Sequence, residues 1–308
     1  MAGSQDYEQD PRNDTALVYV NGALVPRNEA VVSVFDAGFS LGDGVWESFR
    51  VHRGLLPFAD AHLDRLFRGA TAIRLDIGMS RAELLSALRE TIDANGMEDG
   101  VHIRLMVTRG TKRSPTQDPR LALGRPTVVI VPEWKQPRPE VAEEGLTLFT
   151  ASVRCMRADM FDMRLNSHSR LHLITALIQA IDAGADEALM LDPDGFVSSC
   201  NSTNFFFVVD DTVCTSTGTS CFNGITRSIV IELCHESGIP IQLGNFTLAE
   251  VYTASEAFVT GTFGGVTPIR AIDGRPLPAT PGPTTTSLDR LYRARVDTEL
   301  SAIAIAVG

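Results

Sequence analysis

The amino-acid sequence predicts an α+β protein with two lobes. The chain has 308 residues, which is longer than one average domain. Segments with the 3.6-residue period of helices alternate with short apolar runs typical of strands. A proline-rich, charged segment at 132–140 has the composition of a linker. We therefore expect a flexible arm at 1–15, a small N-terminal lobe at 16–132, a linker at 133–144 and a larger C-terminal lobe at 145–308.

The N-terminal lobe is expected to combine a sheet with two helices. Asn21 and Gly22, between two short apolar runs, predict a hairpin turn. The segment 36–47 is rich in glycine, which indicates positive φ angles or close approach of another segment, with an ordinary turn as the alternative. The elements expected in order are a hairpin at 16–25, a strand at 48–52, helices at 58–77 and 80–95, and strands at 101–108 and 126–131.

The C-terminal lobe is expected to contain more strands, with helices between them. A polar segment at 161–170 leads into an apolar stretch with helical spacing, and Gly184 is suited to end that helix. The turn residues at 193–195 then separate two strand-like runs. The elements expected in order are a strand at 146–153, a helix at 171–183, strands at 187–192, 204–209 and 211–215, a helix at 229–236, a strand at 240–243, a helix at 247–252, a strand at 256–260 and a helix at 284–303.

The composition argues against several classes of partner. A net charge of −11 disfavours nucleic acid, because proteins that bind it usually present a clustered basic face. No apolar run reaches the roughly 18 residues that a membrane span needs, and the polar N-terminus does not resemble a signal peptide. The five cysteines lack CxxC spacing, which favours reduced thiols in the cytoplasm and gives no indication of a metal site. The only lysines are Lys112 and Lys135.

Two glycine-bearing segments are candidates for binding a phosphate. Ile225 and Thr226 follow Gly224 at the start of a predicted helix, where unpaired N–H groups favour an anion. The segment 260–262, which contains Thr262, ends a strand and could add a hydroxyl and further N–H groups. A helix cap is the simpler explanation for Thr226. Arg65, which follows His62 on a helix of the other lobe, could bring a positive charge, although a surface salt bridge is the commoner role of a helical arginine.

Two further segments are dense in hydrogen-bonding side chains. Asn166 and His168 lie in the first, and Ser199, Cys200 and Asn204 lie in or beside the second. Such clusters often line a site, but loops are rich in Ser and Asn in any case. A contact of His168 with Cys200 or Ser199 would suggest nucleophilic chemistry. Sequence spacing does not establish that contact.

These segments together resemble the class IV aminotransferases. This is the pyridoxal-phosphate fold-type IV family of branched-chain and D-amino-acid aminotransferases and aminodeoxychorismate lyase. The motifs occur in family order between about residues 17 and 276. The segments that carry the resemblance are 39–47, 62–66, 104–110, 184–189, 195–197, 201–204, 223–227, 260–262 with 267–268, and 272–275.

The resemblance implies a small N-terminal α/β lobe and a larger, barrel-like C-terminal lobe, with a cofactor site between them and usually a homodimer. The cofactor would be pyridoxal 5'-phosphate or pyridoxamine 5'-phosphate. In the family its phosphate is held by the positions that match Arg65, Ile225, Thr226 and Thr262, and all four are suitable here. Asn204, in the family's Asn-Ser-Thr-Asn segment, is also expected to bind the cofactor.

The same resemblance places two substitutions at the catalytic positions. The family attaches its cofactor to the lysine that opens a K-x-x-N-x-L segment, and Asn166 stands at that position. A carboxylate after the G-F-V turn protonates the pyridine nitrogen in the family, and Ser199 stands there. Because no lysine follows Lys135, no shift of alignment restores the first group. An asparagine amide cannot form an imine, and a serine hydroxyl cannot keep a pyridinium protonated.

Several functions remain open on this evidence. The first is a divergent family member that binds the cofactor, or another small phosphorylated ligand, non-covalently and performs amino-group or related chemistry on a small amine or amino acid. The second is a cofactor-independent hydrolase, lyase or isomerase that uses His168 with Cys200 or Ser199. The third is a non-catalytic relative, and the fourth is transamination through Lys112. Candidate substrate contacts are Phe39, Lys112, Arg113 and Phe263, and core packing is the alternative for the aromatic residues.

Overall fold

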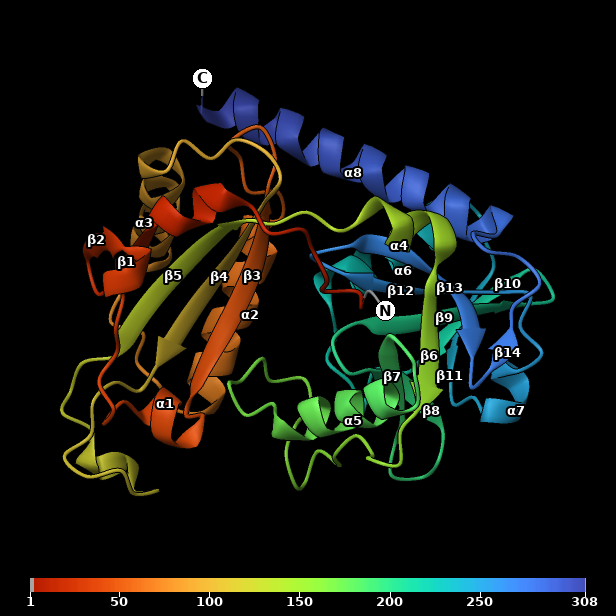
Figure 1. The fold of residues 1–308 in the computed structure, drawn as a ribbon, viewed down its shortest axis with the longest axis horizontal. Helices are drawn as coiled ribbons and strands as arrows, with labels where there is room; N and C mark the ends of the chain where they lie inside the picture. The colour runs from red at the N-terminus through yellow and green to blue at the C-terminus, as the bar shows by residue number, and fades with distance from the viewer. Residues whose placement is uncertain (1–2, 308) are drawn as a thin grey trace. The chain divides into compact units, whose positions relative to one another are not determined.

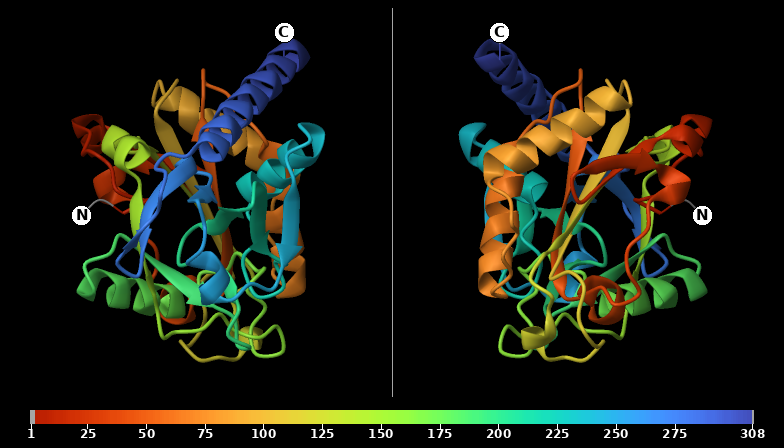
Figure 2. Two further views of the ribbon diagram at one scale, coloured as in Figure 1. Left: turned by 90° about the vertical axis from the view of Figure 1, so that its right-hand side faces the viewer. Right: turned by 90° about the vertical axis from the view of Figure 1, so that its left-hand side faces the viewer.

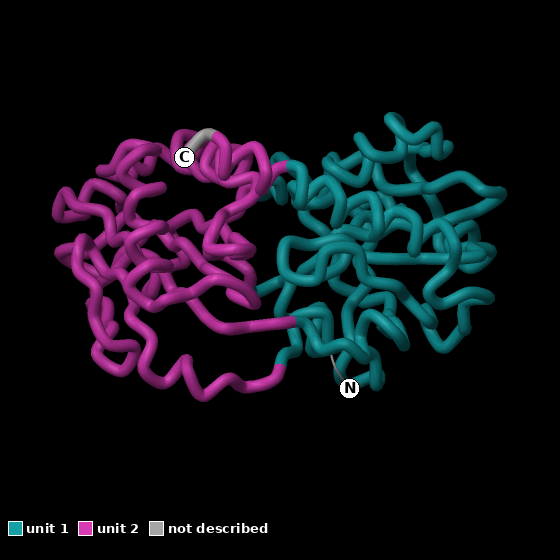
Figure 3. Tube along the Cα trace, turned by 90° about the horizontal axis from the view of Figure 1, so that it is seen from above, with its two compact units in different colours: residues 1–7, 137–164, 171–298 teal, residues 8–136, 165–170, 299–308 magenta. Residues whose placement is uncertain are grey.

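The computed structural model describes residues 3–307, which form two compact units. Unit 1 contains residues 3–7, 137–164 and 171–298 of the described chain (teal in Figure 3). Unit 2 contains residues 8–136, 165–170 and 299–307 (magenta in Figure 3). The segment 165–170 falls within the predicted C-terminal lobe but groups with unit 2. Asn166 and the helix that follows it therefore belong to different units.

Unit 2 is built on an antiparallel sheet of five strands in the order β2-β1-β5-β4-β3 (Figure 1). Asn21 has a φ of 51° and Gly22 a φ of 96°, as the predicted hairpin turn requires. The strands are β1 (Leu17–Val20), β2 (Ala23–Pro26), β3 (Gly44–Val51), β4 (Val101–Thr108) and β5 (Thr127–Trp134).

The helices of unit 2 cover this sheet with apolar side chains. On α2 (Ala59–Ala72), Leu63, Leu66 and Ala70 recur at helical spacing and are buried in the core against the sheet. A capping box between Ser80 and Glu83 fixes the start of α3 (Arg81–Ala94). Both predicted helices are confirmed, although α2 ends earlier than predicted. The shorter helices are α1 (Ala37–Leu41), η1 (Pro11–Thr15), η2 (Arg27–Glu29) and η3 (Pro119–Leu121).

Unit 1 is built on a mixed sheet of nine strands that curls strongly (Figure 2). Its main path runs β11-β10-β9-β12-β13-β6-β7-β8, and β14 pairs with β13. The strands are β6 (Leu146–Thr150), β7 (Glu187–Leu191), β8 (Val197–Cys200), β9 (Asn204–Val209), β10 (Thr212–Ser216), β11 (Ile241–Gly244), β12 (Glu256–Gly261), β13 (Gly265–Ile272) and β14 (Arg275–Pro276).

The two faces of the central strands in unit 1 pack into separate cores. Phe205 and Phe207 of β9 lie in one core, whereas Phe206 and Phe258 lie in the other with Val230 of α6. Alternate residues thus point to opposite faces, and both faces are apolar. The helices are α4 (Pro139–Glu144), α5 (Leu171–Asp182), α6 (Ile225–Glu236), α7 (Leu248–Val251) and α8 (Pro283–Val307), of which α8 continues into the part of the chain assigned to unit 2.

The predicted α+β class is confirmed, and the segments expected to be irregular contain more structure than their composition indicated. Within the predicted arm, Asn13 is buried and pairs with both backbone groups of Trp134, while residues 1 and 2 lie outside the described residues. Within the predicted linker, Pro139 begins α4, because proline fits the first turn of a helix. Among residues 3–307, no helix is long and apolar enough to span a membrane.

Candidate functional site

The predicted site residues fall into two groups, one in each unit. In unit 1, Asn204 on β9 lies directly opposite Thr260 on β12 in the antiparallel ladder. Opposed residues of such a pair project to the same face of the sheet. Asn204 Oδ1 accepts a hydrogen bond of 3.1 Å from the backbone N–H of Gly224, and its Nδ2 donates to the Phe222 carbonyl at 2.6 Å. Asn204 therefore fixes the chain that enters α6, with the Thr260 side chain beside it.

The N-terminus of α6 presents unpaired backbone donors. Gly224 is its N-cap, with a φ of −65° and a ψ of 145°, and no side chain among the described residues caps the helix. The first N–H groups of a helix have no partner within it, and the helix dipole adds positive potential. A Cβ on Gly224 would lie 2.4 Å from Asn204 Oδ1, so only glycine fits there. Thr226, in the first turn, is buried.

The Thr260 hydroxyl is buried and has no hydrogen-bond partner in the described part of the chain. Leaving a hydroxyl in this state costs about 1–3 kcal/mol, so such groups are rare unless a ligand completes them. The Arg227 Nε, in the first turn of α6, is also buried and has no partner among residues 3–307, and burial lowers the pKa of this guanidinium. These groups and the uncapped helix end are a candidate anion-binding arrangement within unit 1. Thr262 lies in the turn after β12.

Ser199 and Cys200 are held in ways that do not suit nucleophilic catalysis. The Ser199 hydroxyl donates to the Thr203 carbonyl at 2.8 Å and accepts from Asn204 Nδ2 at 3.2 Å. Burial, and then the charge of Glu187, raise the pKa of the Cys200 thiol well above its usual value. A thiol needs a lowered pKa to supply a thiolate at neutral pH. The hypothesis that either residue is a nucleophile therefore finds no support in its surroundings.

Glu187, beside this loop, is a fully buried carboxyl group. It accepts hydrogen bonds from the hydroxyls of Ser202 at 2.7 Å and Thr203 at 2.7 Å, and from that of Ser4. Burial raises its pKa to about 7 against the opposing effect of these donors. Glu187 thus links the described N-terminal segment to the loop that precedes Asn204.

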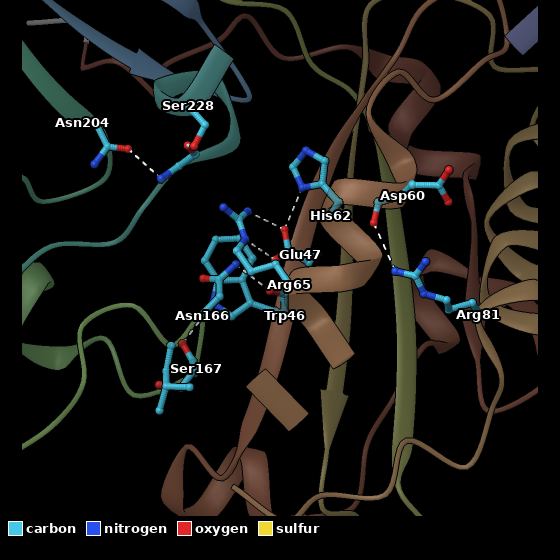
Figure 4. A network of polar contacts seen from close by, with 12 residues as sticks. Trp46, Glu47, Asp60, His62, Arg65, Arg81, Asn166, Ser167, Asn204 and Ser228 are labelled. Carbon is cyan, nitrogen blue, oxygen red and sulfur yellow. Dashed lines mark hydrogen bonds and ion pairs between the residues drawn. The ribbon is translucent and has the colours of Figure 1, made fainter. Parts of the chain in front are cut away.

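In unit 2, the helix residue Arg65 forms a buried ion pair with Glu47 of β3 (Figure 4). Arg65 donates to Glu47 Oε1 from Nε at 2.7 Å and to Oε2 from Nη2 at 2.7 Å, and His62 Nδ1 lies 2.8 Å from Oε2. Burial raises the pKa of Glu47, but the bonds and charge of Arg65, followed by those of His62, outweigh burial and lower it. Burial lowers the pKa of His62. Arg65 is thus held in place by a carboxylate, and its role as a phosphate ligand stays a prediction.

Asn166 has both atoms of its amide engaged within unit 2. Its Nδ2 donates to the Trp46 carbonyl at 2.6 Å, and its Oδ1 accepts from Arg170 Nη2. The Trp46 N–H donates to the Asn166 carbonyl at 2.9 Å, and Trp46 Nε1 donates to the Ser167 carbonyl at 3.0 Å (Figure 4). Asn166, which the resemblance places at the family's lysine position, thus joins segment 165–170 to β3 through these hydrogen bonds.

His168 is a weak base in this structure. Burial, followed by the charge of Arg104, lowers its pKa to about 4, so the imidazole is neutral at neutral pH. Its Nε2 is buried and has no partner among the described residues, and its backbone N–H donates to the Gly44 carbonyl at 3.0 Å. The His168 ring packs against Gly44. A Cβ added to Gly44 would lie only 2.6 Å from His168 Cδ2. An acid/base role is favoured by a pKa near the working pH, so the lowered pKa of His168 disfavours this role at neutral pH.

The candidate substrate contacts have different surroundings. Phe39 on α1 is 70% exposed, whereas Phe263 is 4% exposed and packs in the interior. Lys112 is also buried, and its Nζ donates to the Thr116 carbonyl of its own loop. Lys112 therefore stabilises that loop, which disfavours both a carboxylate-binding role and transamination through this residue. Arg113 lies in the same loop and donates its backbone N–H to the Leu121 carbonyl at 2.9 Å.

Several residues with marked environments were not assigned roles from the sequence. Asn166 and Arg170 contact each other in a segment that is not helical, so their spacing of four residues is no signal for the contact. Glu47 is separated from Arg65 by a strand-to-helix connection, and their pairing has no local sequence signal. The orphaned hydroxyl of Thr260 likewise follows from the pairing of β12 with β9.

Comparisons with known proteins show the family to which the chain belongs. The family model for amino-transferase class IV matches residues 44–272. The chain belongs to the class IV aminotransferase family. It is 37% identical over 288 residues to branched-chain-amino-acid aminotransferase-like protein 2 of Arabidopsis thaliana, covering 93% of this chain and 51% of that relative. It thus spans about half the length of this class IV relative.

Other class IV relatives are matched over most of their length. A putative branched-chain-amino-acid aminotransferase of Methanocaldococcus jannaschii is 38% identical, with 84% of this chain and 88% of that protein covered. A branched-chain amino acid aminotransferase from T.th., solved with N-(5'-phosphopyridoxyl)-L-glutamate, superposes with a TM-score of 0.85 at 28% identity and covers 92% of this chain and 95% of that chain. The same enzyme was solved with pyridoxamine 5'-phosphate. The predicted fold-type IV architecture is confirmed.

The residues of this class IV chain fit one end of the family's cofactor and not the other. The uncapped start of α6 and the orphaned Thr260 hydroxyl suit a phosphate. By contrast, residue 166 carries an amide whose two atoms are already bonded, and residue 199 carries a hydroxyl that donates to a carbonyl. Neither can attach the cofactor or hold a proton on a pyridine nitrogen as a carboxylate would. No covalent step through the cofactor follows from these groups.

Proposed function

We propose that this chain binds pyridoxal 5'-phosphate, pyridoxamine 5'-phosphate or a related small phosphorylated ligand without a covalent link. The observation that carries the proposal is the anion-binding arrangement of unit 1. There, Gly224 leaves the start of α6 uncapped, and the Gly224 N–H donates to Asn204, which lies opposite Thr260 in the β9–β12 pair. The Thr260 hydroxyl has no protein partner among the described residues. A phosphate would accept hydrogen bonds from the N–H groups of Ile225 and Thr226 and satisfy the buried hydroxyl.

The non-covalent character of the proposal rests on the lysines. Asn166 stands at the position that carries the attachment lysine in the family, and Lys112 and Lys135 are the only lysines of the chain. Lys112 is buried and bonded within its own loop. A Schiff base requires a neutral amine that can reach the aldehyde, and Asn166 offers none. The names of the relatives support amino-group or related chemistry on a small amine or amino acid as the associated activity.

Few side chains of this chain are suited to proton transfer in such an activity. Bound pyridoxal phosphate ordinarily supplies an electron sink for chemistry at an amino carbon. Here Ser199 offers a hydroxyl where the family places a carboxylate, and His168 has a pKa of about 4. The side chains therefore support ligand binding more strongly than proton transfer. A turnover assay across amines and amino acids separates an enzyme from a non-catalytic binding protein.

The binding proposal is tested by comparing pyridoxamine 5'-phosphate with pyridoxamine in equilibrium dialysis. We expect the phosphorylated compound to bind at least about tenfold more tightly, because the phosphate supplies several charge-assisted hydrogen bonds. Gly224→Ala should remove most of this preference, since its Cβ would displace Asn204. Ser228→Ala, further along the same helix where Ser228 is exposed, is the matched control and should keep it. Equal affinity of the wild-type protein for both compounds would refute the proposal.

We also infer a homodimer in the cytoplasm. Helix α5 carries an exposed apolar stripe at helical spacing, in which Leu171 is 75%, Ile174 53%, Ile178 51% and Ile181 50% exposed. Contiguous exposed apolar surface of this kind marks an interaction site, and a second copy of the chain is the partner that the family resemblance implies. The free thiols of the five cysteines support a reducing compartment.

A further inference from the structure

Residues 3–7 form a short N-terminal segment of unit 1. The segment lies outside residues 44–272, which the family model matches. Ser4 is the one buried residue of this segment, at 6% exposed, and its hydroxyl donates a hydrogen bond to Glu187 Oε1. The contact of Ser4 with Glu187 therefore attaches an otherwise partly exposed segment to the interior of unit 1.

Two further contacts of segment 3–7 lie nearer the surface. Asp6 Oδ2 lies 3.2 Å from Arg138 Nε, and these two side chains are 36% and 39% exposed. Tyr7 forms an isolated β-bridge with Pro137. Exposed ion pairs contribute little to stability, and segments with few buried contacts open locally at low cost. The segment can thus detach without the loss of a helix or a strand of the sheet.

Glu187 connects Ser4 with the loop 201–204. Its Oε1 also accepts from the Ser202 hydroxyl at 2.7 Å, and its Oε2 accepts from the Thr203 hydroxyl at 2.7 Å. Ser4 Oγ lies 3.4 Å from Ser202 Oγ, so the two hydroxyls meet at the same carboxylate oxygen. Glu187 is 2% exposed. Because a buried carboxyl group depends on its hydrogen-bond donors, release of Ser4 disturbs the contacts that the loop makes with Glu187.

The same loop fixes the start of α6. The Thr203 carbonyl accepts from the Cys200 N–H at 3.0 Å and from the Ser199 hydroxyl at 2.8 Å. Asn204 comes next in the chain, and its Oδ1 accepts from the Gly224 N–H at 3.1 Å. A continuous series of contacts within unit 1 therefore runs from the N-terminal segment to the candidate anion-binding arrangement.

We propose that segment 3–7 is a latch that controls the candidate anion-binding arrangement of unit 1. While Ser4 is bound, the loop 201–204 is fixed. Asn204 then holds Gly224 at the start of α6. When the segment detaches, the loop gains conformational freedom, and ordering it again adds an entropic cost to anion binding. This inference adds a means of regulation to the proposed function, on which it rests for the identity of the ligand.

The test compares the whole 308-residue chain with its Ser4→Ala variant, which lacks the hydroxyl that binds Glu187. Isothermal titration calorimetry measures the affinity for pyridoxamine 5'-phosphate and for pyridoxamine, and hydrogen–deuterium exchange measures the opening of residues 199–204 and 221–226. We expect the affinity for pyridoxamine 5'-phosphate to fall by about threefold to tenfold, and exchange in both segments to rise by a similar factor. The affinity for pyridoxamine should change less, because it has no phosphate.

Ser255→Ala is the matched control. The Ser255 hydroxyl also forms one hydrogen bond within unit 1, to the Val208 carbonyl at 3.2 Å, but near the end of β9 that is opposite Asn204. This variant should keep the affinity for pyridoxamine 5'-phosphate and the exchange of both segments. A change as large as that in Ser4→Ala would mean that the effect is not specific to the latch, and it would overturn the inference.

A second variant keeps the inference testable if water replaces the lost hydroxyl in Ser4→Ala. Ser4→Asp places a second carboxylate against Glu187, whose pKa is raised to about 7, so at about pH 8 the two groups repel each other and the segment should detach. The loss of affinity and the rise in exchange should be at least as large as in Ser4→Ala. Thermal unfolding midpoints establish that both variants are folded. Unchanged affinity and unchanged exchange in both folded variants would overturn the inference.

The outcomes also separate this inference from the proposed function. If the wild-type protein prefers pyridoxamine 5'-phosphate to pyridoxamine and the folded Ser4 variants bind it as tightly, the inference fails and the proposed function stands. A lower affinity without faster exchange would also overturn the inference, because the loss would then not come from opening of the loop. If the wild-type protein shows no such preference, the proposed function fails, and exchange alone decides the inference. Faster exchange of residues 199–204 and 221–226 in the Ser4 variants then supports the latch, and unchanged exchange overturns it.

Discussion

Thr260→Val tests whether the buried hydroxyl of Thr260 belongs to the ligand. Valine has nearly the same shape and a high preference for strands, so the change removes the hydroxyl and little else. The hydroxyl has no partner among the described residues, and Thr260 is 1% exposed. Removing an unsatisfied buried hydroxyl should raise the free energy of unfolding of the ligand-free protein by about 1–2 kcal/mol. The same change should weaken binding of pyridoxamine 5'-phosphate by about tenfold, because one phosphate donor is lost.

Thr215→Val is the matched control for this prediction. Thr215 is also 1% exposed on a strand of the same sheet, but its hydroxyl donates to the Phe205 carbonyl at 2.7 Å. Its removal should lower the free energy of unfolding by about 1–2 kcal/mol and leave ligand affinity unchanged. Urea unfolding without ligand and calorimetric titration with ligand measure both quantities. If Thr260→Val destabilised the protein as Thr215→Val does and bound the ligand normally, the assignment of its hydroxyl to a phosphate would be wrong.

Further predictions concern the buried carboxyl groups and the exposed helix. Glu47→Gln breaks the buried ion pair with Arg65 and should cost about 3–5 kcal/mol in urea unfolding, and a loss below about 1 kcal/mol would contradict its role. Because the pKa of Glu187 is raised to about 7, its contribution to stability is largest below its ordinary pKa and is lost as pH rises toward 7. The stability of the wild-type protein relative to Glu187→Gln should therefore fall by on the order of 3 kcal/mol between about pH 4.5 and 7, and a rise would refute the assignment. Ile178→Asp should convert a dimer to monomers in sedimentation equilibrium, and an unchanged dimer would exclude α5 from the interface.

The sequence was informative where structure follows from local pattern. Helical spacing located α2, α3 and α5, and Asn21 with Gly22 located the first hairpin, because these signals lie within a few residues of one another. The assignment of Asn166 to the family's lysine position rests on the motif order and stays a prediction, whereas the sequence itself shows that no lysine follows Lys135.

The environments of the site residues depend on pairings between distant segments. Cys200 carries no local sign of its raised pKa, which comes from burial and from Glu187 on a neighbouring strand. From the sequence, Asn166 is notable only for its position in the motif. In the structure, its side-chain amide forms hydrogen bonds with Trp46, which is 120 residues away in the chain, and with Arg170. Lys112, in a polar loop, is buried by the folding of that loop. Hydrophobic periodicity contains no information on these contacts.

The absence of a covalent link to the cofactor is the central claim, and one measurement addresses it directly. The wild-type protein is saturated with pyridoxal 5'-phosphate, half of the sample is treated with borohydride, and the intact mass is determined after denaturation, while dialysis of the other half gives the amount bound. We expect ligand bound at up to one molecule per chain and an intact mass without a phosphopyridoxyl group. A borohydride-fixed phosphopyridoxyl group on Lys112 or Lys135, at the stoichiometry of binding, would contradict the claim.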